Sequence, residues 1–198
     1  MAVRALNHPL ARRYRNALVL GALREDVWYL PIPGTTWEHL SISHFHKAGA
    51  GRSIERLFKN AVREYRSGRI ASAFVQLGRG NHVLADMLCP VHAQRVIHET
   101  DPFEWYIETH MSELRLLPVP DIVVCNRPAQ LVDGLAGYAR AFPADRTNYS
   151  FGRLLYRLGR RHKPDASVNA DCARALLPAG AGYTAAHLRL FLHTVGAT

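Results

Sequence analysis

Three residues with metal-binding side chains lie close together in the segment GNHVLADMLCPVHAQ. His82 and Asp86 are four residues apart on a predicted helix, so their side chains extend from the same face and can reach one ion. His92 follows the helix break expected at Pro90, where the chain can turn back toward the same cavity. Imidazole and carboxylate groups without thiolates suit a catalytic zinc site better than a structural one. The trio therefore predicts a metal centre, and the competing interpretation is an ordinary surface His–Asp pair at helical spacing.

Further ligand-type residues flank this trio in a recognisable order. GALRED runs from Gly21 and ends in Asp26, SHF contains His44, and Glu104 lies at the start of the next predicted helix. The arrangement resembles the zinc-dependent phospholipases C, which share a helical fold with single-strand-specific zinc nucleases. Members of that family carry a glycine-led turn ending in aspartate, a His-Phe pair, His-x3-Asp-x5-His, and then a histidine and a glutamate. The resemblance extends from about Leu10 to Gly196.

The resemblance implies two zinc ions held by side chains from distant parts of the chain. Asp86 is placed to bridge from the first ion toward the second. The implied ligands are Asp26, His44, His82 and Asp86 for the first ion, and His92, His98 and Glu104 for the second.

The third ligand of the second ion departs from the family pattern. Family members have a histidine four residues before the glutamate, and this chain has Thr100 at that position. We expect His98, six residues before Glu104, to replace it from a shortened loop. Glu99 and Asp101 are the alternative donors for the same position.

The beginning of the chain departs from the family as well. Family members usually have an extra N-terminal segment whose terminal amine and a nearby histidine hold a third zinc, and nothing here matches it. His8 lies only 18 residues before Asp26, so we interpret it as a surface residue at a helix start. We therefore expect two metals, or a chain that begins downstream of the true start. As written, without an export signal, we expect the protein to be cytoplasmic, and exported if the true N-terminus lies upstream.

Such a ligand set predicts hydrolysis of phosphate esters. Zinc lowers the pKa of bound water to about 7, and paired ions hold the phosphoryl oxygens of the substrate. Asp26 is expected to be a ligand, the general base that orients this water, or both. Arg24, Arg79 and Arg95 are candidates for binding the phosphate, and exposed surface arginine is the competing interpretation for each.

The net charge of +9 comes almost entirely from arginine and favours anionic partners. We expect a phospholipid or another phosphodiester as substrate, with headgroup cleavage of the phospholipase C type and peripheral contact with an anionic membrane surface. One alternative is a single-strand nuclease or nucleotidase on the same scaffold, acting on nucleic acid. The other is a non-catalytic helical protein that binds metal or nucleic acid. For the nuclease, the candidate stacking residues are Trp28, Tyr29, Trp37 and Phe45.

Apolar residues recur at spacings of three and four along most of the chain, and alternation typical of strands is almost absent. This predicts an all-α fold in one compact domain over residues 1–198. A long irregular stretch, residues 24–52, is expected to form a wall of the site, and the Pro-rich run 118–128 a loop. Helices are expected from Asn7 through the segment ending at Leu23, from a cap at Ser53 to a stop at Gly68, over 70–89, after a cap at Asp101, over 130–141 and 151–160, and from Ala179 or Tyr183 to His193.

Two further properties bound the class of protein. No apolar run approaches the roughly 20 residues that a membrane-spanning helix needs. Cys89, Cys125 and Cys172 are too few and too scattered for a disulfide scaffold, and the chain has no CxxC pair. We therefore interpret the cysteines as small residues of the core.

Overall fold

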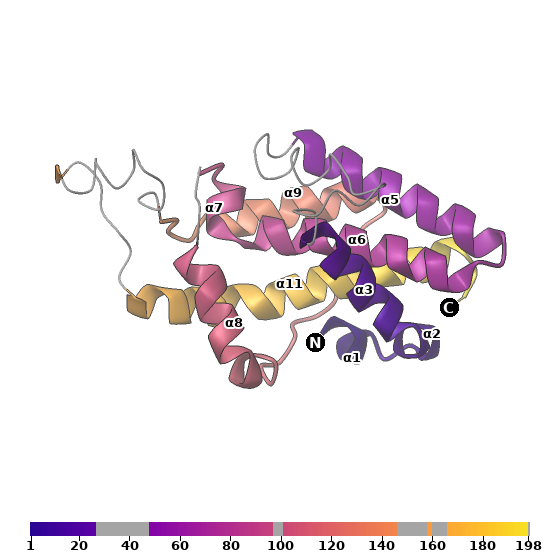
Figure 1. Ribbon diagram of the computed structural model, residues 1–198, viewed down its shortest axis with the longest axis horizontal. Helices are drawn as coiled ribbons and strands as arrows, with labels where there is room; N and C mark the ends of the chain where they lie inside the picture. The colour runs from indigo at the N-terminus through magenta and orange to yellow at the C-terminus, as the bar shows by residue number, and fades with distance from the viewer. Residues whose placement is uncertain (27–47, 97–100, 146–157, 160–165, 198) are drawn as a thin grey trace.

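A computed structural model of the chain describes residues 1–26, 48–96, 101–145, 158–159 and 166–197. Within these ranges every regular element is a helix, which confirms the predicted all-α fold (Figure 1). The helix expected over 151–160 falls almost entirely outside the described residues. No helix in the described part has the length and apolar character needed to cross a bilayer.

The N-terminal part of the chain forms three short helices where the sequence predicts one that begins near Asn7. Asn7 instead ends the first of them, because its backbone is left-handed, with a φ of 50°. The next helix is capped by His8, whose Nδ1 accepts a hydrogen bond from the backbone N–H of Leu10 at 3.3 Å. Pro9 therefore lies in the first turn, as predicted. The three helices are α1 (Ala2–Leu6), α2 (Pro9–Arg13) and α3 (Arg15–Asp26).

Four helices run along the long axis of the molecule (Figure 1). They are α5 (Ala48–Arg66), α6 (Ile70–Leu88), α9 (Pro128–Ala139) and α11 (Ala166–Thr194). The α6 helix is central, because it packs against α3, α5, α9 and α11. Its apolar residues belong to two buried clusters, one at each end of the bundle. The α6 helix is thus the rigid element from which a site can be built.

The α5 helix begins earlier than the sequence predicts. Ser53, the expected cap, is buried within the helix, which starts at Ala48. Ala50 is fully buried, and a Cβ atom at Gly51 would lie 3.6 Å from the Cβ of Ala129 in α9. Packing on α9 therefore outweighs the poor helix propensity of the glycine-rich segment.

The last helix also begins earlier than expected. The sequence predicts a start at Ala179 or Tyr183, whereas α11 begins at Ala166 and continues through Pro178. Proline inside a helix removes a backbone hydrogen bond. The residues that precede it offset this cost, because Cys172, Ala173 and Leu176 are buried in the core.

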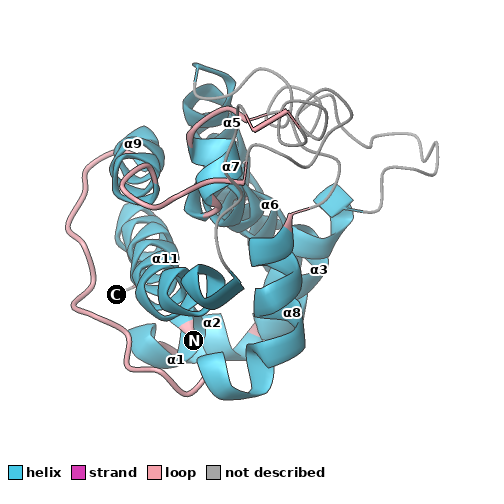
Figure 2. Cartoon of the chain, turned by 90° about the vertical axis from the view of Figure 1, so that its left-hand side faces the viewer, coloured by secondary structure: helices cyan, strands magenta, loops and turns pink. Residues whose placement is uncertain are grey.

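Two further helices, α7 (Pro90–Ala93) and α8 (Pro102–Leu114), lie at one end of the bundle, next to the end of α6 (Figures 1 and 2). The expected loop then runs from α8 to α9, which begins at Pro128 rather than at Gln130. Arg189 of α11 holds this loop, because its guanidinium donates hydrogen bonds to the carbonyl oxygens of Ile122 at 3.0 Å and Val123 at 2.9 Å. In this fold the end of α6, the short α7 helix and the start of α8 lie together.

Candidate metal centre

The first pair of predicted ligands lies on the C-terminal half of α6. His82 and Asp86 are both buried, and Nε2 of His82 is 3.4 Å from Oδ1 of Asp86. The other carboxylate oxygen, Oδ2 of Asp86, is also buried and has no hydrogen-bond partner among the residues that the structure describes. A buried carboxylate oxygen without a donor is costly unless a cation lies beside it. The pair therefore has the character of a cation site.

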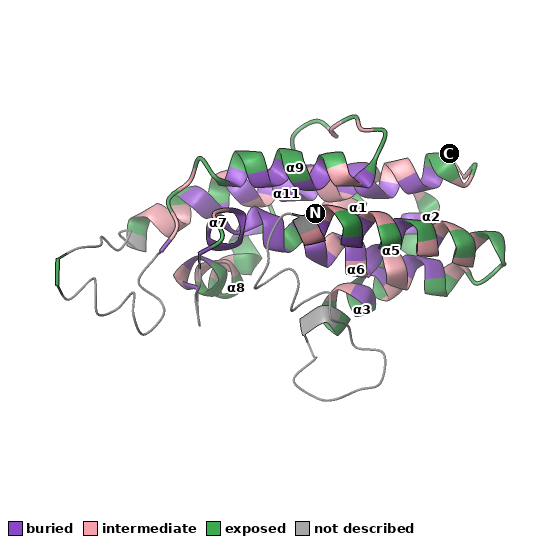
Figure 3. Ribbon diagram, turned by 90° about the horizontal axis from the view of Figure 1, so that it is seen from above, coloured by how far each residue is buried: buried purple, intermediate pink, exposed green. Residues whose placement is uncertain are grey.

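The second pair joins α7 to the first turn of α8. The chain breaks at Pro90, as predicted, and all four residues of α7 are buried (Figure 3). Nε2 of His92 lies 3.4 Å from Oε1 of Glu104, whose side chain is 51% exposed. Arg140 of α9 holds α7 in place, because its Nε donates a hydrogen bond to the carbonyl oxygen of Ala93 at 3.0 Å. The half-exposed glutamate marks the side of this pair that faces solvent.

Asp101 connects α8 to the end of α6. Its Oδ1 accepts a hydrogen bond from the backbone N–H of Phe103 at 3.2 Å, which confirms the predicted helix cap. Its Oδ2 accepts a hydrogen bond from the thiol of Cys89 at 2.7 Å. The cap therefore fixes the start of α8, and with it Glu104, beside the end of α6.

The two pairs are close enough to influence each other electrostatically. Burial disfavours a charge on His92, but the hydrogen bond that its ring donates to Glu104 and the negative charges of Asp86, Glu104 and Asp101 outweigh this effect and raise the pKa of His92. Burial, reinforced by the charges of Asp101 and Glu104, raises the pKa of the Cys89 thiol well above its usual value. The site thus has a negative potential, which favours a cation.

The donor atoms also fit the size of a zinc ion. Two ligands of a tetrahedral zinc with bonds of about 2.0–2.2 Å lie about 3.4 Å apart. The His82–Asp86 and His92–Glu104 pairs both have this separation. The donor set, imidazole and carboxylate, is one that zinc accepts in catalytic sites.

The other predicted site residues are described only in part. Asp26 is the last residue of α3, and its side chain is not among those described; His44, His98, Glu99 and Thr100 lie outside the described residues, as do Trp28, Tyr29, Trp37 and Phe45. Of the seven predicted ligands, the structure therefore brings together His82, Asp86, His92 and Glu104.

The candidate phosphate-binding arginines show no contact that assigns them this role. Arg24 and Arg95 are exposed, and Arg95 has a left-handed backbone with a φ of 58° just after α7. Nη1 of Arg79 lies 3.4 Å from Oε1 of Gln76, one turn earlier on the same helix. Their part in binding a phosphate stays a prediction.

Cys89 is the residue of the site that the sequence analysis does not select. It is only 2% exposed, as expected for a core residue, and Cys172 is also buried. However, Sγ of Cys89 and the ligand atoms of His92 and Glu104 all lie within 4.8 Å of one another. Its position three residues after Asp86 and three before His92 is the sequence signal for this proximity.

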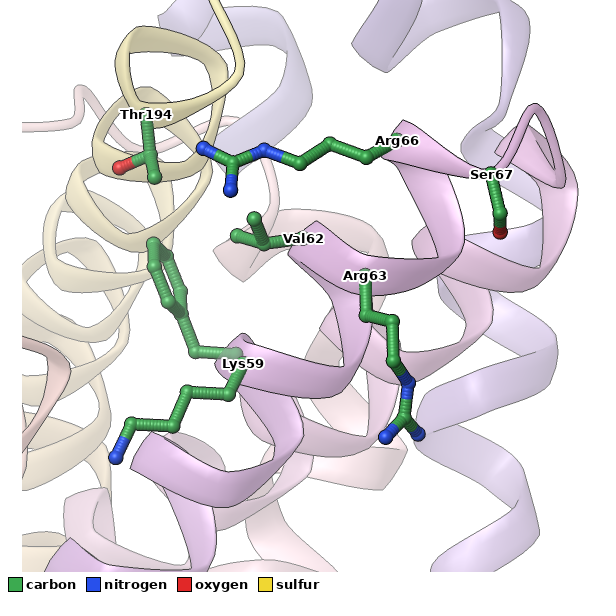
Figure 4. Close-up of a pocket in the computed structure, with 7 residues that line it drawn as sticks. Lys59, Val62, Arg63, Arg66, Ser67 and Thr194 are labelled. Carbon is green, nitrogen blue, oxygen red and sulfur yellow. The ribbon is translucent and has the colours of Figure 1, made fainter.

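A separate groove lies at the opposite end of the long axis, between α5 and the end of α11. It has a volume of about 620 Å³, and Phe58 and Val62 form its apolar part. Three cations line it, of which Arg66 extends toward the end of α11 and Arg63 toward the other side of α5 (Figure 4). The groove contains none of the predicted metal ligands, so we distinguish it from the metal centre. Its basic residues are Lys59, Arg63 and Arg66.

Comparison with known proteins places the chain in a family. A family model described as zinc dependent phospholipase C matches residues 1–117. The matched segment contains all seven predicted ligands, from Asp26 to Glu104. No curated protein matches the chain.

Proposed function

The chain belongs to the zinc-dependent phospholipase C family, and from this premise we propose that it hydrolyses phosphodiester bonds and releases the headgroup from phospholipids. The observation that carries the proposal is the presence of two His–carboxylate pairs at zinc-like separations, buried except for the half-exposed Glu104, within the segment that matches the family. This arrangement resembles a two-metal site for phosphate-ester cleavage.

Two groups of side chains hold the metals in this proposal. His82 and Asp86 belong to the first ion, and the rigid α6 helix fixes their separation. His92 and Glu104 belong to the second ion, together with a third donor, for which the sequence predicts His98. Asp26 and His44 complete the first group.

Zinc at these positions would supply Lewis-acid polarisation of the phosphoryl group and an activated water. Asp86 belongs to the first pair, and its charge also acts on His92 of the second pair, so it would offset the repulsion between two cations held there. Asp26, at the end of α3, is expected to be a ligand, the general base that would orient this water, or both. The buried α6 and α7 residues close the inner side of the site, so the substrate approaches from the exposed side of Glu104.

The charge of the protein supports a lipid surface as the place of action. The net charge of +9 favours contact with anionic headgroups, and such contact needs no membrane-spanning helix. A nuclease on the same scaffold is the second candidate, because Lys59, Arg63 and Arg66 line one groove and would also bind a phosphate backbone. The distance of this groove from the metal centre favours the lipid proposal.

The test combines metal analysis with a substrate comparison. Purified protein loaded with zinc is assayed on phosphatidylcholine vesicles, on a soluble phosphocholine diester and on single-stranded DNA. Headgroup release that is absent in Asp86→Asn supports the proposal. Cleavage of DNA without lipid hydrolysis would indicate the nuclease, and bound zinc without any hydrolysis would indicate a non-catalytic metal-binding protein.

A further inference from the structure

Cys89 lies where α6, α7 and α8 meet. Its backbone is extended and ends α6, with its N–H donating to the carbonyl oxygen of Asp86 at 3.1 Å. The residue is 2% exposed. Its Sγ and the ligand atoms of His92 and Glu104 all lie within 4.8 Å of one another. These three residues come from three different helices or helix ends, which is how folded proteins assemble a metal site from distant parts of a chain.

We infer that Cys89 is the third protein ligand of the second metal ion, which is then held by a thiolate, an imidazole and a carboxylate. The inference rests on the proposed metal centre, but it assigns a donor type that the family pattern of histidines and acidic residues does not contain. Zinc accepts a mixed donor set of this kind, with a Zn–S bond of about 2.3 Å. A ligand role for Cys89 explains how the chain can have Thr100 at the position where the family has a histidine ligand.

The contacts of Asp101 favour Cys89 as the donor over Asp101 itself. One carboxylate oxygen of Asp101 caps α8 through Phe103, and the other accepts the hydrogen bond of the Cys89 thiol. Both oxygens therefore have roles outside the metal site, and Asp101 is not in the group with His92 and Glu104. Asp101 is a positioning residue, because its hydrogen bond fixes the direction of the Cys89 side chain.

A neighbouring carboxylate oxygen indicates that this end of α6 favours cations. Oδ2 of Asp86 is buried and has no hydrogen-bond partner within the described part of the chain. Asp86 precedes Cys89 by three residues on the same face of the helix, and its charge acts on His92. A cation beside Asp86 would satisfy the carboxylate oxygen for which the described residues provide no donor.

Binding of the ion requires one proton to leave. The S–H bond of Cys89 breaks, the proton passes to the solvent, and the sulfur bonds to the metal with the electron pair that the proton leaves behind. Asp101 then loses the thiol hydrogen as its donor. The positive charge of the metal offsets the repulsion between the Cys89 thiolate and the Asp101 carboxylate. No oxidation or reduction is involved.

Cobalt substitution tests this inference without reference to activity. The full chain is loaded with Co²⁺, and the near-ultraviolet spectrum is recorded for a thiolate-to-cobalt charge-transfer band. We expect the band in the wild-type protein, in Cys125→Ser, in Cys172→Ser and in His98→Ala, and we expect its loss in Cys89→Ser. The affinity of Cys89→Ser for zinc should also fall by about tenfold or more, measured by competition with a chromophoric chelator.

A second measurement needs no variant. X-ray absorption at the zinc edge of the loaded wild-type protein should detect a sulfur scatterer at about 2.3 Å. Two bound cobalt ions without a thiolate band would overturn the role of Cys89 and leave the proposed function standing. A thiolate band in a protein that hydrolyses no phosphodiester would retain the role of Cys89 and overturn the proposed function, and a failure to bind either metal would overturn both.

Discussion

Gly21 of α3 and Gly78 of α6 face each other where the two helices cross. A Cβ atom on either glycine would lie 2.9 Å from the Cα atom of the other, so the crossing requires glycine on both helices. Asp26 follows Gly21 by five residues, and His82 follows Gly78 by four. The contact therefore determines where the end of α3, and with it Asp26, lies relative to the metal ligands of α6.

Replacing Gly78 by alanine should force the two helices apart. We expect Gly78→Ala to lower the free energy of unfolding by about 1–3 kcal/mol, because the added methyl group overlaps the backbone of α3 and no side chain can move away. Urea denaturation of the metal-free protein measures this effect directly.

Gly137 provides the matched control. It is an exposed helical glycine of α9, and a Cβ atom added there would meet no atom within 4 Å. Gly137→Ala should therefore raise the free energy of unfolding by about 0.5–1 kcal/mol, the usual gain for alanine in a helix. Equal effects of the two substitutions would contradict a specific contact between α3 and α6.

The elements that the sequence predicts well are those set by local chemistry. Pro90 ends α6, and Asp101 caps α8, because proline geometry and a capping side chain act within a few residues. The early starts of α5 and α11 could not be predicted from the sequence, because they depend on tertiary packing. Ala50 and Leu176 are buried against other helices, and this burial outweighs the nearby glycines and Pro178.

The same distinction holds for the site. Helical spacing places His82 beside Asp86, the break at Pro90 brings in His92, and the family resemblance adds Glu104. The position of Cys89 within the site could not be predicted in this way, because it depends on how the Asp101 cap brings the start of α8 to the end of α6.

His187 should make the protein sensitive to mild acid. This residue of α11 is fully buried and hydrogen bonded through Nδ1 to Oδ1 of Asn81 at 2.8 Å. Burial lowers the pKa of His187 to about 4. An unfolded histidine has a pKa of about 6.5, so between these values the unfolded chain binds a proton that the folded chain does not. Stability is therefore lost as the pH falls through this window, by about 2 kcal/mol between pH 7 and pH 5.

The variant His187→Gln isolates this effect, because it removes the titrating group and leaves the other histidines in place. Denaturant unfolding of both proteins at pH 7 and pH 5 should show a smaller loss of stability in the variant. Parallel losses in the two proteins would show that the buried ring is not the source of the acid sensitivity.

Removal of metal should lower the melting temperature. The proposed ligands come from α6, α7 and α8, and the ions connect these elements only in the folded state. At a free zinc concentration 100 times the dissociation constant, binding adds about 2.7 kcal/mol to the free energy of unfolding. Thermal melting with and without a chelator measures the difference. An unchanged curve, with metal shown by elemental analysis to be removed, would mean that the native fold does not depend on these sites.

Asp86 and Glu104 should differ in the consequences of losing their charge. Asp86 is buried on the central helix, and its charge acts on both His–carboxylate pairs, so Asp86→Asn removes a negative charge where two cations would repel each other. We expect phosphodiester hydrolysis to fall on the order of 100-fold or more, without rescue by added zinc.

Glu104 is half-exposed in the first turn of α8 and serves only the outer ion. Glu104→Gln should weaken metal binding but retain turnover that added zinc partly restores. A zinc titration of both variants, with circular dichroism as a check of folding, distinguishes the two roles. Full activity in Asp86→Asn would refute the two-metal mechanism, and zinc rescue of that variant alone would mean that the roles of the two carboxylates are reversed.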